Sequence, residues 1–152
     1  MKLSLKAMIC GVILAAVVGA AYAGFAKPEK AIRYRQAVMT VIGQHIGQLA
    51  GVIKGEIPYT KKEVVKDATV IKTMADLPWE ASMVPDSYKG DTTLKASVLK
   101  EKEKFMKVAQ QFEMASQELA DTAQNGDLEA LKSQFGKVVQ TCKACHSAYR
   151  KK

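Results

Sequence analysis

Apolar residues recur at intervals of three and four along most of this 152-residue chain, and they divide it into four amphipathic segments. Such spacing places one apolar stripe on each of four helices. The segments cover residues 28–53, 60–75, 94–123 and 128–149. The last stripe consists of Leu128, Leu131, Phe135, Val138, Cys142, Cys145 and Tyr149. With no strand-like alternation elsewhere, the pattern predicts an all-α, antiparallel up-and-down four-helix bundle.

Start and stop signals sharpen the boundaries of these segments. Gly55 is expected to end the first helix, because glycine readily adopts the left-handed conformation that follows a helix. Thr60 followed by Glu63 predicts a capping box at the start of the second helix. Asp127 is expected to cap the last helix. Residues 77–93 are rich in Pro, Gly, Ser and Asp, which predicts a long loop at one end of the bundle.

The first 23 residues have the composition of a cleaved signal peptide. Lys2 and Lys6 supply the positive start, residues 7–20 are almost wholly apolar, and residues 21–23 read Ala-Tyr-Ala, a small-x-small cleavage site. A transmembrane anchor is the alternative, but the apolar run is short for a bilayer and no stop-transfer charge follows it. We therefore expect export to the periplasm and one mature domain, residues 24–152.

Charge narrows the classes of partner. The chain has a formal charge of +8, and loss of Lys2 and Lys6 with the leader leaves +6. A basic exported protein can attract acidic redox partners or anionic lipid, or the charge simply keeps it soluble. The lysines are scattered among acids and lack interleaved aromatic residues, so no nucleic-acid partner is expected.

The residues with the most specific chemistry lie near the C-terminus. Residues 142–146 read C-x-x-C-H, which is typical of covalent haem attachment. Two thiols one helical turn apart can each add to a vinyl group of one porphyrin, and the adjacent imidazole can bind the iron. The same C-x-x-C occurs in thioredoxin-like and zinc sites, but a βαβ surround is missing and only His45 and Cys10 remain as further zinc ligands. We therefore expect one covalent haem c per chain, held in the bundle core.

Arg35 is a second candidate, because it interrupts the apolar stripe of the first helix four residues before Met39. An arginine on a core-facing stripe needs a buried anion, and a haem propionate would supply one. The alternative is a snorkelling side chain whose head group stays in water. Arg150 lies one turn beyond His146 and fits either the proximal side of a haem or a solvated cation at the helix end.

Beyond the motif, the sequence from residue 24 to residue 152 resembles the class II c-type cytochromes, which comprise cytochrome c prime and its low-spin, methionine-ligated relatives. The matching segments are Phe25-Ala26-Lys27-Pro28-Glu29, Tyr34-Arg35-Gln36, Lys54-Gly55-Glu56-Ile57-Pro58-Tyr59, Leu77-Pro78-Trp79, Lys89-Gly90-Asp91 and residues 142–150. A C-x-x-C-H sequence near the C-terminus, rather than near the N-terminus, separates this family from ordinary cytochromes c.

The resemblance implies roles for individual residues. The implied haem-contact residues are Cys142, Cys145, His146 as proximal ligand, Arg35, Gln36 and Asp91. Met39 lies at the position that decides the distal face: in five-coordinate members an apolar residue there blocks the iron, and in low-spin relatives a methionine there binds it. Ordinary core packing of Met39 is a third alternative. His45 lies off the main stripe, and a partly exposed polar role is expected for it.

Two functions of different classes follow. The first is a periplasmic mono-haem electron carrier that exchanges single electrons with periplasmic or membrane-bound redox partners. The second is a five-coordinate haem module that binds nitric oxide or carbon monoxide for buffering or sensing. An enzyme is not expected, because the expected distal wall of Ile32, Met39 and Ile42 offers no group that moves protons. A homodimer formed through the first two helices is a further candidate.

Overall fold

The structure is a computed structural model that describes residues 24, 25 and 27–152, so the predicted signal peptide, residues 1–23, lies outside the described residues. Four long helices dominate: α1 (Pro28–Lys54), α2 (Lys61–Met74), α5 (Lys102–Asn125) and α6 (Leu128–Tyr149). Two short helices, α3 (Pro78–Met83) and α4 (Ser97–Lys100), connect α2 to α5. None of these helices combines the length and apolar character needed to cross a bilayer. The predicted all-α four-helix bundle is confirmed.

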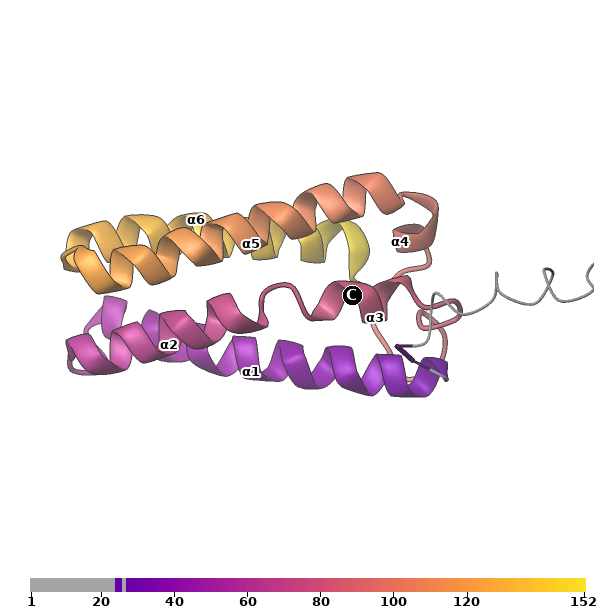
Figure 1. The fold of residues 1–152 in the computed structure, drawn as a ribbon, viewed down its shortest axis with the longest axis horizontal. Helices are drawn as coiled ribbons and strands as arrows, with labels where there is room; N and C mark the ends of the chain where they lie inside the picture. Colours follow the sequence, from indigo (N-terminus) through magenta and orange to yellow (C-terminus); the bar gives the residue numbers. More distant parts are fainter. Residues whose placement is uncertain (1–23, 26) are drawn as a thin grey trace, which may run out of the picture.

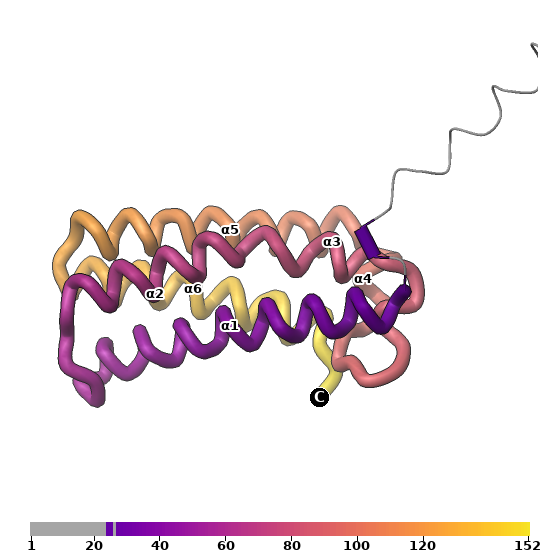
Figure 2. The backbone as a smooth tube through the Cα atoms, turned by 60° about the horizontal axis from the view of Figure 1, so that its bottom comes forward, coloured from indigo at the N-terminus to yellow at the C-terminus, as the bar shows by residue number. Residues whose placement is uncertain are grey.

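The long helices form two layers, with α1 and α2 in one and α5 and α6 in the other (Figure 1). In both views α3 continues the line of α2 toward the opposite end of the bundle (Figures 1 and 2). Helix α1 packs against α2 and α3, α2 packs against α5, and α5 packs against α6. This packing leaves α1 and α6 as facing walls from different layers, and the candidate site lies between them.

Local geometry confirms two of the predicted helix boundaries, the end of α1 and the start of α6, and corrects the predicted cap of α2. Gly55 ends α1 in the left-handed conformation with φ of 77°, as predicted. Asp127 caps α6 through a 2.8 Å hydrogen bond that its Oδ1 accepts from the amide of Ala130. The predicted capping box is wrong, because the side chain of Thr60 makes no cap hydrogen bond and Glu63 instead pairs with Lys66.

The segment between α2 and α5 also differs from the prediction. Residues 77–93 contain the short helix α3, which Pro78 starts at a position where a missing amide hydrogen costs nothing. The third predicted helix does not run unbroken from residue 94. Glu101, with φ of −113° and ψ of 37°, separates α4 from α5.

The core is built from the predicted stripes. Its largest fully buried side chains include Leu49, Ile71, Phe105 and Leu119, one or two from each of α1, α2 and α5. An aromatic cluster joins α3, α5 and α6, because Phe105 makes T-shaped contacts with Trp79 at 5.8 Å and with Tyr149 at 5.2 Å between ring centroids. This cluster forms one side of the candidate site.

The end of α6 is tied back to the loop that precedes α4. Tyr149 O accepts a 2.9 Å hydrogen bond from the amide of Lys95, and Thr93 O accepts a 2.7 Å hydrogen bond from the amide of Lys151. These bonds flank an isolated antiparallel bridge between Leu94 and Arg150. The tie holds residues 92–95 beside the C-terminal half of α6.

Candidate haem site

A cavity of about 760 Å³ lies between α1 and α6, and α3, α5 and residues 90–94 also line it. That volume is in the range of about 300–1,000 Å³ that small-molecule and cofactor pockets occupy. All seven site residues expected from the sequence line it: Arg35, Gln36, Met39, Asp91, Cys142, Cys145 and His146. The fold therefore brings residues of α1 and α6, which are more than 100 positions apart in the sequence, together with a residue of the loop between them.

The α6 wall carries the two cysteines of the motif. Both thiols are half-buried and neither forms a disulfide. Burial raises the pKa of Cys142, and burial together with the neighbouring Cys142 raises the pKa of Cys145 to about 11. A thioredoxin-like site needs a reactive thiolate, which these surroundings disfavour. In addition, no cluster of three or more His, Cys, Asp or Glu residues suited to a metal ion occurs within the described part of the chain.

His146 continues the same wall at the surface of the bundle. Its side chain is exposed to solvent and also lines the cavity. Partial desolvation and the positive charge of Arg150 lower the pKa of His146. The imidazole is therefore held in its neutral form, which is the form that coordinates iron.

Arg35 is buried in the opposite wall, with 6% of its surface exposed, which excludes the snorkelling alternative. Its guanidinium donates hydrogen bonds to Ala81 O at 3.0 Å, to Ser87 O at 3.0 Å and to Thr92 Oγ1 at 2.9 Å. These three oxygens are all neutral, and Arg35 forms no ion pair with any acidic residue that the structure describes. Burial lowers the pKa of Arg35, yet a guanidinium stays protonated. The cavity wall thus contains a buried positive charge without an anion.

Trp79 supplies the second unsatisfied group in this wall. Its Nε1 is buried and has no hydrogen-bond partner, although the side chain lines the cavity. A buried donor without an acceptor costs about 1–3 kcal/mol. A haem with two propionates would offer an anionic acceptor to Arg35, so the cavity fits this cofactor by chemistry as well as by volume.

Gln36 and Asp91 meet at the rim of the cavity. Gln36 Nε2 donates a 2.9 Å hydrogen bond to the backbone carbonyl of Asp91, so the carboxylate of Asp91 is not used in this contact. Both residues are exposed. The bond links α1 to the loop that Arg35 also binds.

The α1 wall across from α6 includes Met39 and Ile42. Met39 is partly buried and packs against the core. Ile32, which was expected on this wall, is buried elsewhere and does not line the cavity. Met83 does not line it either. Met39 is therefore the methionine sulfur that the described residues place at this site.

Sequence reasoning missed several lining residues. Trp79 was expected near the core, but the sequence contains no signal that its indole nitrogen is buried without a hydrogen-bond partner. Phe105, Phe112 and Tyr149 also line the cavity. They belong to the predicted stripes, but a stripe does not distinguish residues that face a cavity from residues that face another helix.

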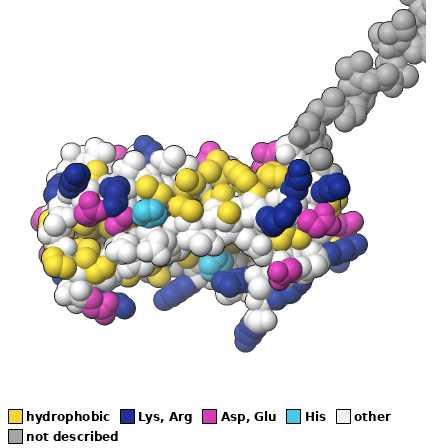
Figure 3. All heavy atoms as spheres, turned by 90° about the horizontal axis from the view of Figure 1, so that it is seen from below, with side chains coloured by type: hydrophobic (Ala, Val, Ile, Leu, Met, Phe, Trp, Pro, Cys, Tyr) yellow, Lys and Arg dark blue, Asp and Glu magenta, His cyan; other side chains and the backbone are white. Residues whose placement is uncertain are grey.

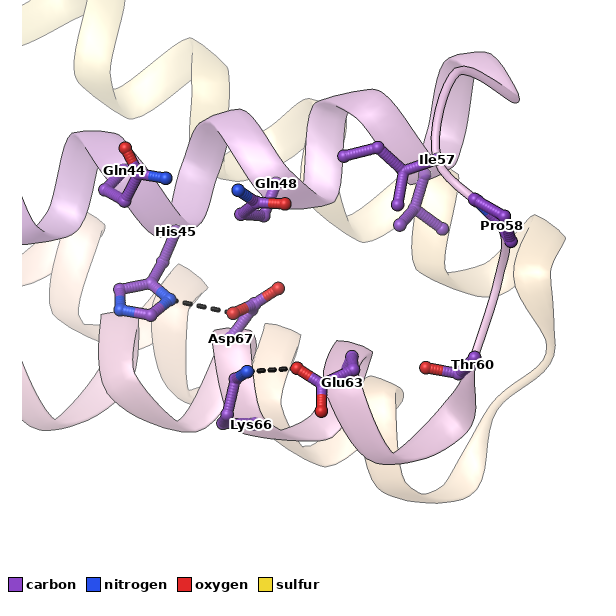
Figure 4. A pocket seen from close by; sticks show the side chains of 10 residues that line it. Gln44, His45, Gln48, Ile57, Pro58, Thr60, Glu63, Lys66 and Asp67 are labelled. Atoms are coloured by element: carbon purple, nitrogen blue, oxygen red, sulfur yellow. Dashed lines mark hydrogen bonds and ion pairs between the residues drawn. The ribbon is translucent and has the colours of Figure 1, made fainter.

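A second pocket of about 510 Å³ lies between α1 and α2, away from the motif (Figure 4). His45 Nδ1 and Asp67 Oδ1 form a 2.8 Å hydrogen bond there, and the Asp67 side chain is only 7% exposed. His45 thus has the partly exposed polar role expected of it. The bond joins α1 to α2, and the pocket contains no residue of the haem cavity.

Known proteins share both the sequence pattern and the fold. A family model described as Cytochrome C' matches residues 30–150. A cytochrome c' from Alcaligenes xylosoxydans xylosoxydans is 38% identical over 128 residues, which cover 84% of this chain and 98% of that protein. Cytochrome c prime from Shewanella frigidimarina has a similar structure with a TM-score of 0.81 and 29% identity, covering 84% of this chain and 99% of that one.

A nitric oxide complex of a mutant cytochrome c prime from Alcaligenes xylosoxidans is also similar, with a TM-score of 0.77 and 38% identity, covering 84% of this chain and 98% of that one. The family model spans most of the described domain, and its match includes the complete C-x-x-C-H sequence. The chain therefore belongs to the cytochrome c' family.

Proposed function

We propose that this protein is exported to the periplasm, where it carries single electrons on one haem. The observation that supports this proposal is the position of His146, which lies exposed at a cavity lined by four helices of the bundle. A redox centre held there would be partly shielded by the bundle and still reachable by a partner protein. The export step rests on the leader, residues 1–23, which lies outside the described residues.

Haem c is the cofactor, as in other cytochromes c', and it supplies one-electron chemistry between ferric and ferrous iron. Cys142 and Cys145, on one turn of α6, would hold it by two thioether bonds, and the imidazole of His146 would bind its iron. Arg35 would donate to a propionate in addition to the oxygens that it already binds. Gln36 and Asp91 would contact the haem at the rim.

No enzymatic reaction is assigned to the site. Beyond Arg35 and Gln36, the α1 wall consists of Met39, Thr40, Ile42, Gly43 and Ile46. The hydroxyl of Thr40 donates to the carbonyl of its own helix, at Gln36 O. This wall therefore supplies no acid or base for proton transfer.

Gas binding is the second candidate function, and a specific observation favours it. Beyond Arg35 and Gln36, apolar side chains and one thioether form most of the α1 wall, which suits a small neutral ligand there. A solved relative holds nitric oxide. In this alternative Met39 only fills space, whereas in a low-spin carrier its sulfur is an axial ligand.

The visible spectrum of the ferrous holoprotein, with and without carbon monoxide, tests these functions. Met39→Leu preserves volume, with a packing cost below about 1.5 kcal/mol, and removes the sulfur lone pair. If Met39 is a ligand, the wild type is low-spin and this variant is high-spin with faster carbon monoxide binding. Met106→Leu is the matched control, because Met106 packs on the core and does not line the cavity.

Each result supports one function. A reversible one-electron potential together with a low-spin wild type supports the electron carrier. A high-spin wild type that binds carbon monoxide or nitric oxide supports the gas-binding module. A low-spin spectrum that survives Met39→Leu would contradict both assignments of Met39, and the absence of a reversible couple would contradict electron transfer.

A further inference from the structure

Charge is divided unevenly between the two helices of one layer. From Ala130 to Lys152 the chain carries six cations and no acid. Residues 101–125, which form α5 and its cap, instead carry five acids and three lysines. Among the described residues, Lys132 is the only one of the six cations that forms an ion pair, with Glu129. The remaining five form a group of unpaired positive charges on the C-terminal half of α6 and the tail.

Helical periodicity places two of these charges on either side of the haem cavity. The cavity-lining positions within α6 run from Thr141 to Tyr149, and at 100° per residue they span about 140° of the helix circumference. Lys137 lies about 40° outside one edge of that arc, next to Thr141, and Lys143 lies about 60° outside the other edge, next to His146. Both lysines are exposed.

The tail adds charge at the same opening. Arg150 lines the cavity, and Lys151 Nζ is held near the 88–92 loop by Tyr88 O and Thr92 O, at 3.3 and 3.4 Å. Figure 3 shows Lys and Arg side chains gathered around one of the two histidines on that face, whereas acidic side chains lie beside the other. We call these five residues the basic rim: Lys137, Lys143, Arg150, Lys151 and Lys152.

We propose that the basic rim docks an acidic protein surface over the exposed edge of the haem cavity. The five unpaired cations outnumber the one acidic residue that lines the cavity, Asp91, and such an excess of positive charge attracts a partner of opposite charge over about 10 Å at 0.1 M salt and orients it on encounter. A lipid surface fits less well, because membrane binding by basic segments also uses apolar side chains that insert between lipids. The exposed large apolar residues lie on α1, α4, α5 and the α1–α2 turn, and none lies on α6.

Cross-linking locates the docking surface in the wild-type holoprotein. A carbodiimide couples carboxylates directly to lysine amines that lie in contact with them, and poly-L-glutamate serves as the acidic polypeptide. Peptide mass spectrometry is expected to find coupling concentrated at Lys137, Lys143, Lys151 and Lys152. Coupling that is spread equally over Lys62 and Lys72, which are exposed on α2, would overturn the proposal.

Paired variants separate a local surface from overall charge. Lys137→Glu with Lys143→Glu reverses two rim charges, and Lys62→Glu with Lys72→Glu changes the net charge equally on a helix that does not reach the cavity. At low salt, the affinity of the holoprotein for poly-L-glutamate is expected to fall at least about tenfold in the rim variant and less than about twofold in the control.

Three outcomes would contradict the proposal. An equal loss of affinity in both variants would mean that only net charge matters. Binding that persists unchanged in the rim variant would place the acidic partner elsewhere. Binding to vesicles of phosphatidylglycerol and phosphatidylcholine, lost in the rim variant while poly-L-glutamate does not bind the wild type, would assign the rim to a membrane. Neither assay depends on the reduction potential or on the spin state, so the electron-carrier and gas-binding functions can fail separately.

Discussion

Replacing Arg35 by Met tests the most extensively hydrogen-bonded side chain of the cavity wall. Methionine keeps an unbranched apolar stem and removes the guanidinium. Three oxygens then lose their donor: Ala81 O, Ser87 O and Thr92 Oγ1. Since these oxygens belong to α3 and the following loop, the substitution removes three of the hydrogen bonds that join that segment to α1.

The expected loss of stability follows from these contacts. A hydrogen bond to a charged donor contributes about 1.5–3 kcal/mol, so three bonds set an upper limit near 9 kcal/mol. Removing the buried charge returns part of this amount, because its desolvation cost disappears. We therefore expect the free energy of unfolding to fall by about 3–5 kcal/mol. For a domain of this size the melting temperature would drop by roughly 10–15 °C.

Urea unfolding of the holoprotein, followed by far-ultraviolet circular dichroism, measures this change. Arg33→Met is the control, because Arg33 is exposed on the same helix two residues earlier. We expect the control to change the free energy of unfolding by less than about 0.5 kcal/mol. A loss below about 1 kcal/mol for Arg35→Met would refute the argument that Arg35 holds the 81–92 segment.

Two further predictions concern the cavity and the α1–α2 contact. Trp79 is the only tryptophan of the chain and lines the cavity, so its fluorescence should be strongly quenched by haem in the folded holoprotein and should rise on unfolding in urea; bright fluorescence from the folded holoprotein would place the haem elsewhere. His45→Gln removes the hydrogen bond to the buried carboxylate of Asp67 and should destabilise the fold by about 1–3 kcal/mol in thermal melts; an unchanged melting temperature would mean that water replaces the imidazole.

The long helices could be predicted because each buries a stripe that repeats over several turns. Helix α3 has only six residues, which is too short for a periodic pattern, and the proline-rich composition of its surroundings indicated a loop. The break at Glu101 has no local signal either, since lysines and acids surround it. The predicted capping box at Thr60 failed for a different reason, because the carboxylate of Glu63 forms an ion pair with Lys66.

Some residues of the candidate site could likewise be predicted from the sequence, and others could not. Cys142, Cys145 and His146 could be found because haem attachment requires a fixed local spacing, and that spacing is visible in one turn of sequence. The neutral partners of Arg35 and the unpaired nitrogen of Trp79 could not be found, because both depend on how the 81–92 segment lies against α1. Met39 could be placed in the cavity from its stripe, because the core-facing side of α1 also lines the cavity.

The central claim is that Cys142 and Cys145 hold one haem by two thioether bonds. Peptide mass spectrometry of the purified mature protein after acid-acetone treatment tests it most directly. We predict one haem on the peptide that contains residues 142–146, none in the acetone extract, and a chain that begins at Gly24. Haem recovered in the extract, or haem attached to any other peptide, would contradict the account.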